Sequence, residues 1–410
     1  MEGSSMRILV LNGGSSSIKF SVFHAEDGPR SAGSCPAVLI DGQLSGIGAA
    51  GARLRIAKSE KPGSLPYESA VAAEGLEEAV ISVLDAVSGA MRSAVDAVGY
   101  RVVHPGPKLR EHQKITQDVL KDLEAAIEFA PLHDPEALVL IRATMQRFPD
   151  VAHYACFDTV FHQSMPAEAT TYPLPPEYQK RGVRRYGFHG LSCESVVEQL
   201  RARGAVPRRM VIAHLGSGCS VTALLDGRSV DTTMGLTPTG GVVMGTRSGD
   251  LDPGLVLYLL RVQQANGEAA AAAVEKLLNQ ESGIAALSLM ANDVKAVRAA
   301  ANAGNPEAVL ALKVFTRSVT KAIGSFCWLL GGLDAIVFAG GIGEHDWQTL
   351  VDILAASKEL GTELKPSLTP TDIDGYQEIS SGASQIRVYI IPAQEDRMIA
   401  IHVARMAKSS

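Results

Sequence analysis

The chain has 410 residues, 46% of them hydrophobic, and a formal net charge of −6. This length predicts about two to three domains, and the charge gives no support for a nucleic-acid partner or a polybasic membrane anchor. No apolar stretch approaches the length of a transmembrane helix, and residues 1–5 lack a signal-peptide pattern. The five cysteines are scattered, which argues against a disulfide scaffold or zinc site and predicts a cytoplasmic protein.

The first recognisable element is a strand–turn–strand pattern near the N-terminus. Residues 8–11 are an apolar run that predicts a buried strand, residues 12–14 predict a tight turn, and residues 18–23 predict a second strand. Between the strands lie glycines, hydroxyls and Lys19. Glycine lets backbone N–H groups approach a phosphate, hydroxyls donate further hydrogen bonds, and lysine supplies charge. The alternative interpretation is a Gly/Ser hairpin that binds nothing.

Further elements follow in chain order. The pattern predicts strands within 24–66, a helix at 68–90, a strand at 97–104, helices at 118–129 and 134–146, a strand at 152–159, a long irregular loop at 164–187 and a helix at 192–203. Residues 46–51 match the dinucleotide-binding spacing Gly-x-Gly-x-x-Gly. We interpret this match as fortuitous, because residues 53–56 alternate like a strand and do not open a helix.

Residues 211–225 repeat the strand–turn–strand pattern without a gap, so that Gly216 matches Gly13 and Ser220 matches Ser17. An internal repeat of this kind indicates a duplicated fold. Two half-chains that each present a phosphate-binding hairpin resemble the actin, hexokinase and heat-shock ATPase superfamily. The second copy therefore favours the phosphate-binding interpretation of both hairpins.

The second half of the chain is rich in glycine. Residues 231–253 contain many glycines and Arg247, helices are predicted at 254–280 and 305–330, and residues 334–344 predict a strand that leads into a glycine turn at a helix start. Such a turn offers backbone N–H groups to a nucleotide. A polar connection at 366–384, a strand at 387–392 and a terminal helix from 393 complete the chain. In the first half of the chain, Asp158 lies at the carboxyl end of the predicted strand at 152–159. Ligands of open sheets bind beyond such strand ends.

Seven sequence motifs occur in the order in which the acetate kinase (acetokinase) family has them. The chain resembles this family from residue 6 to the last helix. The motifs span residues 12–19, 101–104, 131–135, 157–162, 185–190, 244–253 and 341–344. The resemblance implies an α/β, duplicated two-domain actin-like ATPase (ribonuclease H-like) fold with a central interdomain cleft. Domain I would contain residues 6–160 plus 393–410, and domain II residues 161–392.

The resemblance implies reversible transfer of the ATP γ-phosphoryl group to acetate, giving acetyl phosphate and ADP, by direct in-line transfer with Mg²⁺ or Mn²⁺, in a homodimer. It implies catalytic roles for Arg101, His133, Asp158, His189 and Arg247, and metal binding by Asp158, Glu395 and Asn12. Arg101, Val103, Leu132, Phe188 and Pro238 would bind the acid. The implied nucleotide or phosphate contacts are Asn12, Ser15, Ser17, Lys19, His214, Gly216, Ser217, Gly218, Asp293, Val294, Lys295, Gly341, Ile342, Gly343 and His345.

The implied chemistry agrees with these residue types. A carboxylate needs no strong base, but it must approach a polyanion, and arginines, a histidine donor and Mg²⁺ reduce that repulsion. The planar fork of arginine suits both carboxylate and phosphoryl oxygens. Each residue also has a structural alternative: ion pairs for the arginines, satisfied core or cap roles for the histidines, and plain core for the apolar side chains. Asp158 could cap the helix after its strand, and Glu395 could be a first-turn carboxylate that the helix dipole favours.

Departures from the family pattern leave three alternatives open. Ser217 and His345 replace asparagines, and residues 293–295 replace an Asp-Phe-Arg or Asp-Met-Arg segment, so the phosphoryl donor stays open between ATP, GTP and pyrophosphate. Propionate or butyrate kinase is the alternative for the acceptor, although Val103 favours the smallest acid. A nucleotide-binding regulatory protein of the same fold is the non-enzyme alternative, which would not need Arg101, His189 and Arg247 together.

Overall fold

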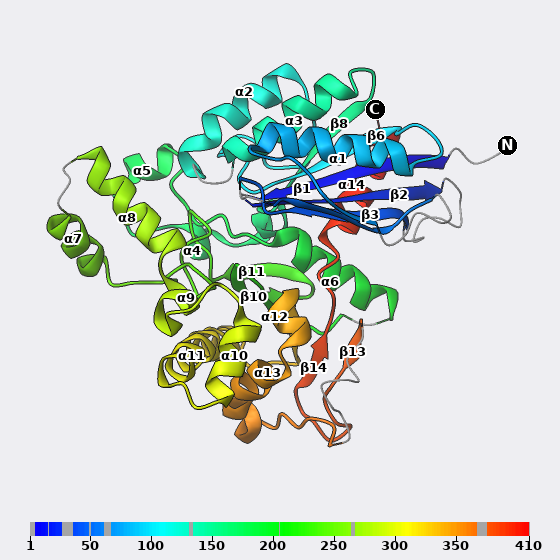
Figure 1. Ribbon diagram of the computed structural model, residues 1–410. Coiled ribbons are helices and arrows are strands. Elements are labelled where there is room, and N and C mark those ends of the chain that lie inside the picture. Colours follow the sequence, from blue (N-terminus) through cyan, green and yellow to red (C-terminus); the bar gives the residue numbers. More distant parts are fainter. Residues whose placement is uncertain are drawn as a thin grey trace. The chain divides into compact units, whose positions relative to one another are not determined.

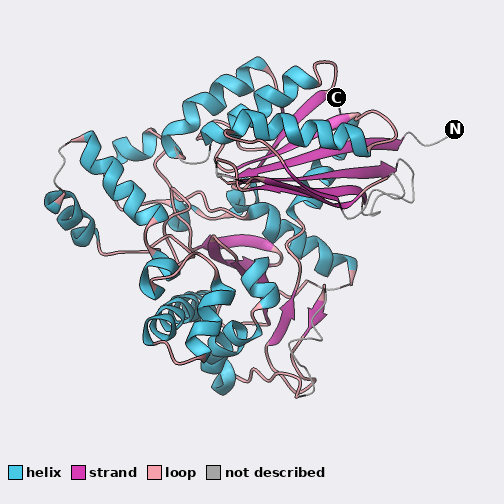
Figure 2. Ribbon diagram, in the orientation of Figure 1, coloured by secondary structure: helices cyan, strands magenta, loops and turns pink. Residues whose placement is uncertain are grey.

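The computed structural model describes residues 5–14, 16–26, 36–48, 51–60, 67–130, 134–204, 206–263, 267–366 and 375–409. The chain splits into two compact units. Unit 1 consists of Met1–Val160 with Gln394–Ser410, and unit 2 consists of Phe161–Ala393. Each unit is built on one sheet with helices packed against it (Figures 1 and 2).

Unit 1 contains an eight-stranded sheet in the order β5-β4-β3-β2-β1-β6-β8-β7. Its strands are β1 (Ser5–Gly14), β2 (Ser17–Glu26), β3 (Ala37–Ser45), β4 (Arg53–Lys58), β5 (Tyr67–Ala70), β6 (Ala97–Val102), β7 (Gln113–Lys114) and β8 (Ala152–Phe157). Strands β1 to β5 form an antiparallel meander, whereas β6 is parallel to both β1 and β8. Because parallel strands end at one edge, this topology places the residues that follow β6 and β8 side by side.

The helices of unit 1 cover both faces of its sheet. They are α1 (Leu76–Ala90), α2 (Gln117–Ala125), the 3-10 helix η1 (Ala126–Phe129), α3 (Asp134–Arg147) and α14 (Glu395–Lys408). Helices α1 and α3 pack on one face and α14 on the other, behind the sheet in Figure 1. Close packing of α14 requires Gly99 in β6, because a Cβ there would lie 2.6 Å from Ile399 and 2.7 Å from Val403.

Unit 2 contains a six-stranded sheet in the order β11-β10-β9-β12-β14-β13. Its strands are β9 (Arg209–Leu215), β10 (Cys219–Leu225), β11 (Arg228–Thr232), β12 (Ala335–Ala339), β13 (Gln377–Glu378) and β14 (Arg387–Ile390). Strand β9 pairs antiparallel with β10 and parallel with β12, which pairs parallel with β14. The same arrangement relates β1 to β2, β6 and β8, so the repeat predicted from the two hairpins extends to the sheets.

Unit 2 is richer in helices than unit 1 (Figure 2). They are α4 (Ala167–Thr170), α5 (Pro176–Lys180), α6 (Gly190–Ala202), α7 (Pro253–Val262), α8 (Glu268–Gln280), α9 (Gly283–Ser288), α10 (Val294–Asn302), α11 (Pro306–Leu329), α12 (Gly340–His345), α13 (Trp347–Leu354) and the 3-10 helix η3 (Ala355–Leu360). The 3-10 helix η2 (Val160–Ser164) spans the point where unit 1 ends and unit 2 begins. Among the described residues, no helix combines the length and the apolar composition that crossing a bilayer requires.

The structure corrects four predictions of local structure. Residues 12–14 do not form a turn but continue β1, paired with residues 17–19 of β2. The helix predicted at 68–90 begins only at Leu76, since Gly75 is extended with φ −144°. The helix predicted at 254–280 is two helices, because Gln263 is extended and Gly267 has φ 60°. The loop predicted at 164–187 contains α4 and α5, and α5 has proline at a first-turn position that favours a helix start.

Candidate active site

Two predicted residues form an ion pair at the carboxyl end of the unit 1 sheet. Arg101 lies near the end of β6 and Asp158 directly follows β8, and the parallel register pairs Arg101 with Cys156. The Arg101 Nε donates to Asp158 Oδ1 at 3.0 Å, and its Nη2 donates to Oδ2 at 2.6 Å. The Asp158 side chain is 1% exposed and that of Arg101 is 21% exposed. This two-point contact fixes the plane of the guanidinium.

Two more predicted residues contact the same guanidinium. Arg101 Nη1 lies 3.6 Å from Glu395 Oε2 and donates to Asn12 Oδ1 at 3.4 Å. Glu395 is the first residue of α14, and Asn12 lies near the end of β1, next to β6. Burial alone would lower the pKa of Arg101, but the charges of Asp158 and Glu395 raise it above its usual value. Arg101 is therefore positively charged at every working pH.

Asp396 joins this cluster and was missed by the sequence analysis. Its Oδ1 accepts a hydrogen bond from Asn12 Nδ2 at 3.3 Å, and Ser21 Oγ lies 3.4 Å from its Oδ2. Burial, followed by the charge of Glu395, raises the pKa of Asp396. Because Asp396 binds the amide nitrogen of Asn12, the amide oxygen faces Arg101. Its position beside Glu395 in the first turn of α14 is the signal that could have found it.

The unit 1 cluster has the donor set of a magnesium site. Asp158, Glu395 and Asn12 place two carboxylates and an amide oxygen around one guanidinium. Mg²⁺ prefers oxygen ligands and is usually held by one or two carboxylates together with water. These residues therefore fit the ion that the family resemblance implies. Their assignment as metal ligands stays a prediction.

A second cluster lies in unit 2 around His189. This residue precedes α6 with φ 59°, and its Nδ1 is 2.9 Å from Ser220 Oγ. Its ring stacks on that of His214, with 4.1 Å between the ring centroids, and His214 Nδ1 is 2.8 Å from Ser192 Oγ. Both histidines are buried, at 8% exposure. The two Nε2 atoms lie near the glycines of the β9–β10 turn, because an added Cβ would be 3.7 Å from His214 Nε2 at Gly216 and 3.4 Å from His189 Nε2 at Gly218.

Glycines of that turn lie against His189 and Arg247. A Cβ added to Gly218 would lie 3.4 Å from both His189 Nε2 and Arg247 Nη1. Arg247 Nη1 also donates to the Pro238 carbonyl oxygen at 3.1 Å. A histidine nitrogen, a guanidinium and a glycine backbone thus surround one small space in unit 2. Such a set of donors suits an oxyanion or a phosphoryl group.

Predicted nucleotide residues also meet in unit 2. A Cβ on Gly216 would be 3.9 Å from the Gly341 backbone nitrogen, so the β9–β10 turn faces the start of α12. Ser217 Oγ accepts from Asn292 Nδ2 at 3.2 Å, immediately before residues 293–295. Asp293 itself caps α10, since its carboxylate accepts from the backbone nitrogens of residues 295 and 296. Asp293 therefore has a structural role as a helix cap, and the nucleotide contacts of Ser217 and Gly341 stay predictions.

The comparison with known proteins identifies the family. A model of the acetokinase family matches residues 7–401. The chain belongs to this family. It is 37% identical to the acetate kinase of Parabacteroides distasonis over 402 residues, which is 96% of this chain and 98% of that protein.

Two crystal structures with 31% sequence identity extend this result to the fold. The acetate kinase of Porphyromonas gingivalis has a TM-score of 0.83 and covers 98% of this chain and 100% of its own. A propionate kinase of Francisella tularensis has a TM-score of 0.84, with coverage of 98% and 99%. The predicted duplicated α/β fold and the predicted kinase are confirmed. The interdomain cleft, the homodimer, the cytoplasmic location and the individual site residues stay predictions.

The remaining predicted site residues differ in how deeply they are buried, and three of them are not described. Ser15, Leu132 and His133 lie outside the described residues. Val103 is half-buried in unit 1, and in unit 2 Phe188 and Pro238 are buried. Lys19, Lys295 and His345 are exposed; Ser17, Val294, Ile342 and Gly343 are buried or half-buried.

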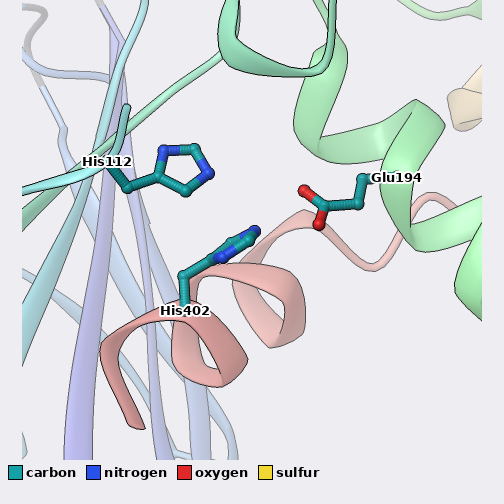
Figure 3. A group of neighbouring side chains, drawn as sticks. All are labelled: His112, Glu194 and His402. Atoms are coloured by element: carbon teal, nitrogen blue, oxygen red, sulfur yellow. The ribbon is translucent and has the colours of Figure 1, made fainter. Parts of the chain in front are cut away.

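A pair of histidines outside the predicted site was also missed. The His112 ring lies edge to face with that of His402 in α14, with 4.1 Å between the centroids (Figure 3). His112 Nδ1 accepts from the Phe157 backbone nitrogen at 3.1 Å, so the proton of the neutral ring is on Nε2. Burial, and then the charge of His402, lowers the pKa of His112 to about 3. In this tautomer Nε2 carries the proton and has no lone pair to offer to a metal.

Proposed function

We propose that this member of the acetokinase family is an acetate kinase, which transfers the γ-phosphoryl group of ATP to acetate and produces acetyl phosphate and ADP. The observation that carries the proposal is the contact of Arg101 with Asp158, Glu395 and Asn12 in a chain that matches its relatives along nearly all their length. Unit 1 and unit 2 would be the two functional domains.

Arg101 and Arg247 hold the acetate carboxylate and the migrating phosphoryl group. Two anions repel each other in this reaction, and positioned guanidinium groups reduce the repulsion without needing a base. His189 donates from Nε2 to a phosphoryl oxygen, because Ser220 can donate its hydroxyl proton to Nδ1 and fix that tautomer. Negative charge moves toward ADP during the transfer, and the donor groups of Arg101, Arg247 and His189 stabilise it.

Asp158, Glu395 and Asn12 would hold Mg²⁺, which would supply positive charge to offset the negative charge of the phosphate groups. Backbone N–H groups at the ends of the β1–β2 and β9–β10 hairpins and the side chains of Ser17 and Lys19 bind the phosphates. Val103, Leu132, Phe188 and Pro238 contact the methyl group of acetate. A longer acid costs about 1–3 kcal/mol per methylene in such a pocket, so acetate is preferred over propionate without excluding it.

Replacement of Arg247 with alanine tests the catalytic assignment. Acetyl phosphate, trapped as its hydroxamate, should form about 10³-fold more slowly than in the wild type. Arg247→Lys is the matched control: it keeps the charge and loses the fork, so its rate should lie between the two. An Arg247→Ala variant with wild-type turnover would remove Arg247 from the reaction.

The substrates are tested separately. Acetate, propionate and butyrate compared by kcat/KM should give the order acetate, propionate, butyrate; a higher value for propionate makes the chain a propionate kinase. ATP, GTP and pyrophosphate compared at equal concentrations should favour ATP. Strong activity with pyrophosphate alone would overturn the ATP assignment.

Helix α7 is the proposed contact between two copies of the chain. None of its residues is buried, and three of them are large apolar side chains: Leu257 is 56% exposed, Tyr258 54% and Val262 51%. Exposed apolar side chains gathered on one helix are typical of protein interfaces. In light scattering, the wild type should have twice the mass of the chain and Leu257→Asp the mass of one. Ile81→Asp, on the 57% exposed Ile81 of α1, is the control; a dimeric Leu257→Asp variant would reject α7.

A further inference from the structure

His189 occupies a backbone turn that most side chains avoid. Its φ is 59° and that of Gly187 is 76°, both in the left-handed region. A residue other than glycine stays there only when its surroundings hold it. The side chain of His189 is held by Ser220, as described above, but this contact does not fix the backbone of the turn.

His162 supplies the contact to the backbone. It lies in η2, is 1% exposed, and its Nε2 is 2.9 Å from the Phe188 carbonyl oxygen. Its Nδ1 is 2.9 Å from Ser229 Oγ. A carbonyl oxygen only accepts, so the proton is on Nε2 and Nδ1 accepts from the serine hydroxyl. Both ring nitrogens are thus engaged in one defined tautomer.

The ring of His162 also limits the space of the turn. A Cβ added to Gly187 would lie 2.8 Å from the His162 ring and 2.5 Å from Thr232 Cγ2. Burial lowers the pKa of His162 to about 4, so the ring is neutral at physiological pH. Because the ring is neutral and both of its nitrogens are hydrogen-bonded within the protein, His162 does not donate a proton to a substrate. It can instead hold the left-handed turn in place.

We propose that His162 is a positioning residue for phosphoryl transfer. Its Nε2–H holds the Phe188 carbonyl, fixes the turn at residues 187–189, and so aims His189 Nε2 at Gly218 and Arg247. This inference rests on the proposed role of His189. The sequence shows His162 only as the last residue of a motif, without a function.

Three variants test the contact. His162→Leu removes both hydrogen bonds and should lower kcat about 10- to 100-fold, the range expected when a catalytic group is displaced by up to 1 Å. The KM values for acetate and ATP should change less than about twofold, because substrate contacts remain. His162→Gln places an amide N–H near the Nε2 position and should recover most of the kcat. Ser229→Ala removes only the Nδ1 partner and should remain close to the wild type.

A double-mutant cycle separates this inference from the proposed function. If His162 acts through His189, then kcat of His162→Leu/His189→Ala should equal that of His189→Ala alone. Multiplied losses in the double variant would show that His162 acts independently and would overturn the inference. A wild-type kcat in His189→Ala would instead reject the proposed role of His189.

Folding is measured in the same variants. If His162→Leu does not fold, the Gln variant decides: a folded Gln variant with near wild-type kcat supports the contact to Phe188. A folded Gln variant whose kcat and both KM values worsen together would show a merely structural role. The NMR chemical shifts of the His189 ring, which report its surroundings, should change in His162→Leu and not in Ser229→Ala; unchanged shifts in His162→Leu would overturn the inference.

Discussion

Gly218→Ala places one methyl group where the phosphoryl group is proposed to lie. The added Cβ would be 3.4 Å from His189 Nε2 and from Arg247 Nη1, which is ordinary van der Waals contact. The φ of Gly218 is not positive, so alanine fits its backbone conformation. The free energy of unfolding should therefore change by less than about 1 kcal/mol.

The effect on catalysis should be much larger. A phosphoryl oxygen that accepts from both nitrogens must lie about 2.7–3.1 Å from each, and a carbon 3.4 Å from both already fills that position. Displacement of the reacting group by about 1 Å costs roughly 100-fold in rate. We expect kcat/KM of Gly218→Ala to fall by about this factor.

Hydroxamate trapping measures the rate, and thermal melting measures stability. Gly324→Ala is the control, because a Cβ at Gly324 in α11 meets nothing within 4 Å. It should keep full activity and gain about 0.5–1 kcal/mol of stability. A Gly218→Ala enzyme within threefold of wild-type kcat/KM would refute the steric reasoning, as would a loss of activity explained entirely by unfolding.

Three further predictions concern stability. Burial raises the pKa of Asp134 to about 8, so between about pH 4 and pH 8 the unfolded chain has released a proton that the folded chain keeps, and the stability of the fold decreases as the pH rises. The Tm of Asp134→Asn should therefore equal that of the wild type near pH 4 and exceed it at pH 8, and a Tm difference that does not depend on pH would contradict this. Asn305 caps α11 by accepting from the Ala308 backbone nitrogen, so Asn305→Ala should lose about 1 kcal/mol in urea unfolding and Asn305→Asp much less; equal losses would reject the cap. Gly187→Ala should lose about 2–4 kcal/mol, from its φ of 76° and the contacts of its Cβ; a loss below about 1 kcal/mol would show that the turn adapts.

The elements that could be predicted from sequence have local signals. The β1–β2 and β9–β10 hairpins show alternation and a glycine-containing centre, and their likeness indicates the duplication. Asp158 could be placed because a strand ends just before it, and the parallel register of β6 and β8 then brings it to Arg101. Local pattern and sheet topology together account for this half of the site.

Contacts between distant parts of the chain could not be predicted in this way. Asn12 and Asp396 are 384 positions apart, and their hydrogen bond depends on where α14 packs on the sheet. His162 was visible as a motif residue, but its bond to Phe188 depends on the left-handed turn, which no pattern of apolar residues indicates. The start of α1 was misplaced because Val71 continues the helical spacing, while its backbone nitrogen is bonded to Ala52 in a strand-like pairing.

The structure also bears on whether Arg101 has a structural or a catalytic role. Asp158 binds two of its nitrogens, as it can in a structural ion pair, yet the third nitrogen, Nη1, is directed at Asn12 and Glu395 and the side chain is 21% exposed. Asp396 adds a further carboxylate to the same cluster, so negative groups outnumber the guanidinium that they surround. That excess of negative charge would suit a divalent cation. The two-point ion pair with Asp158 fixes the plane of the guanidinium and leaves Nη1 directed at other groups, so it does not exclude the proposed catalytic role.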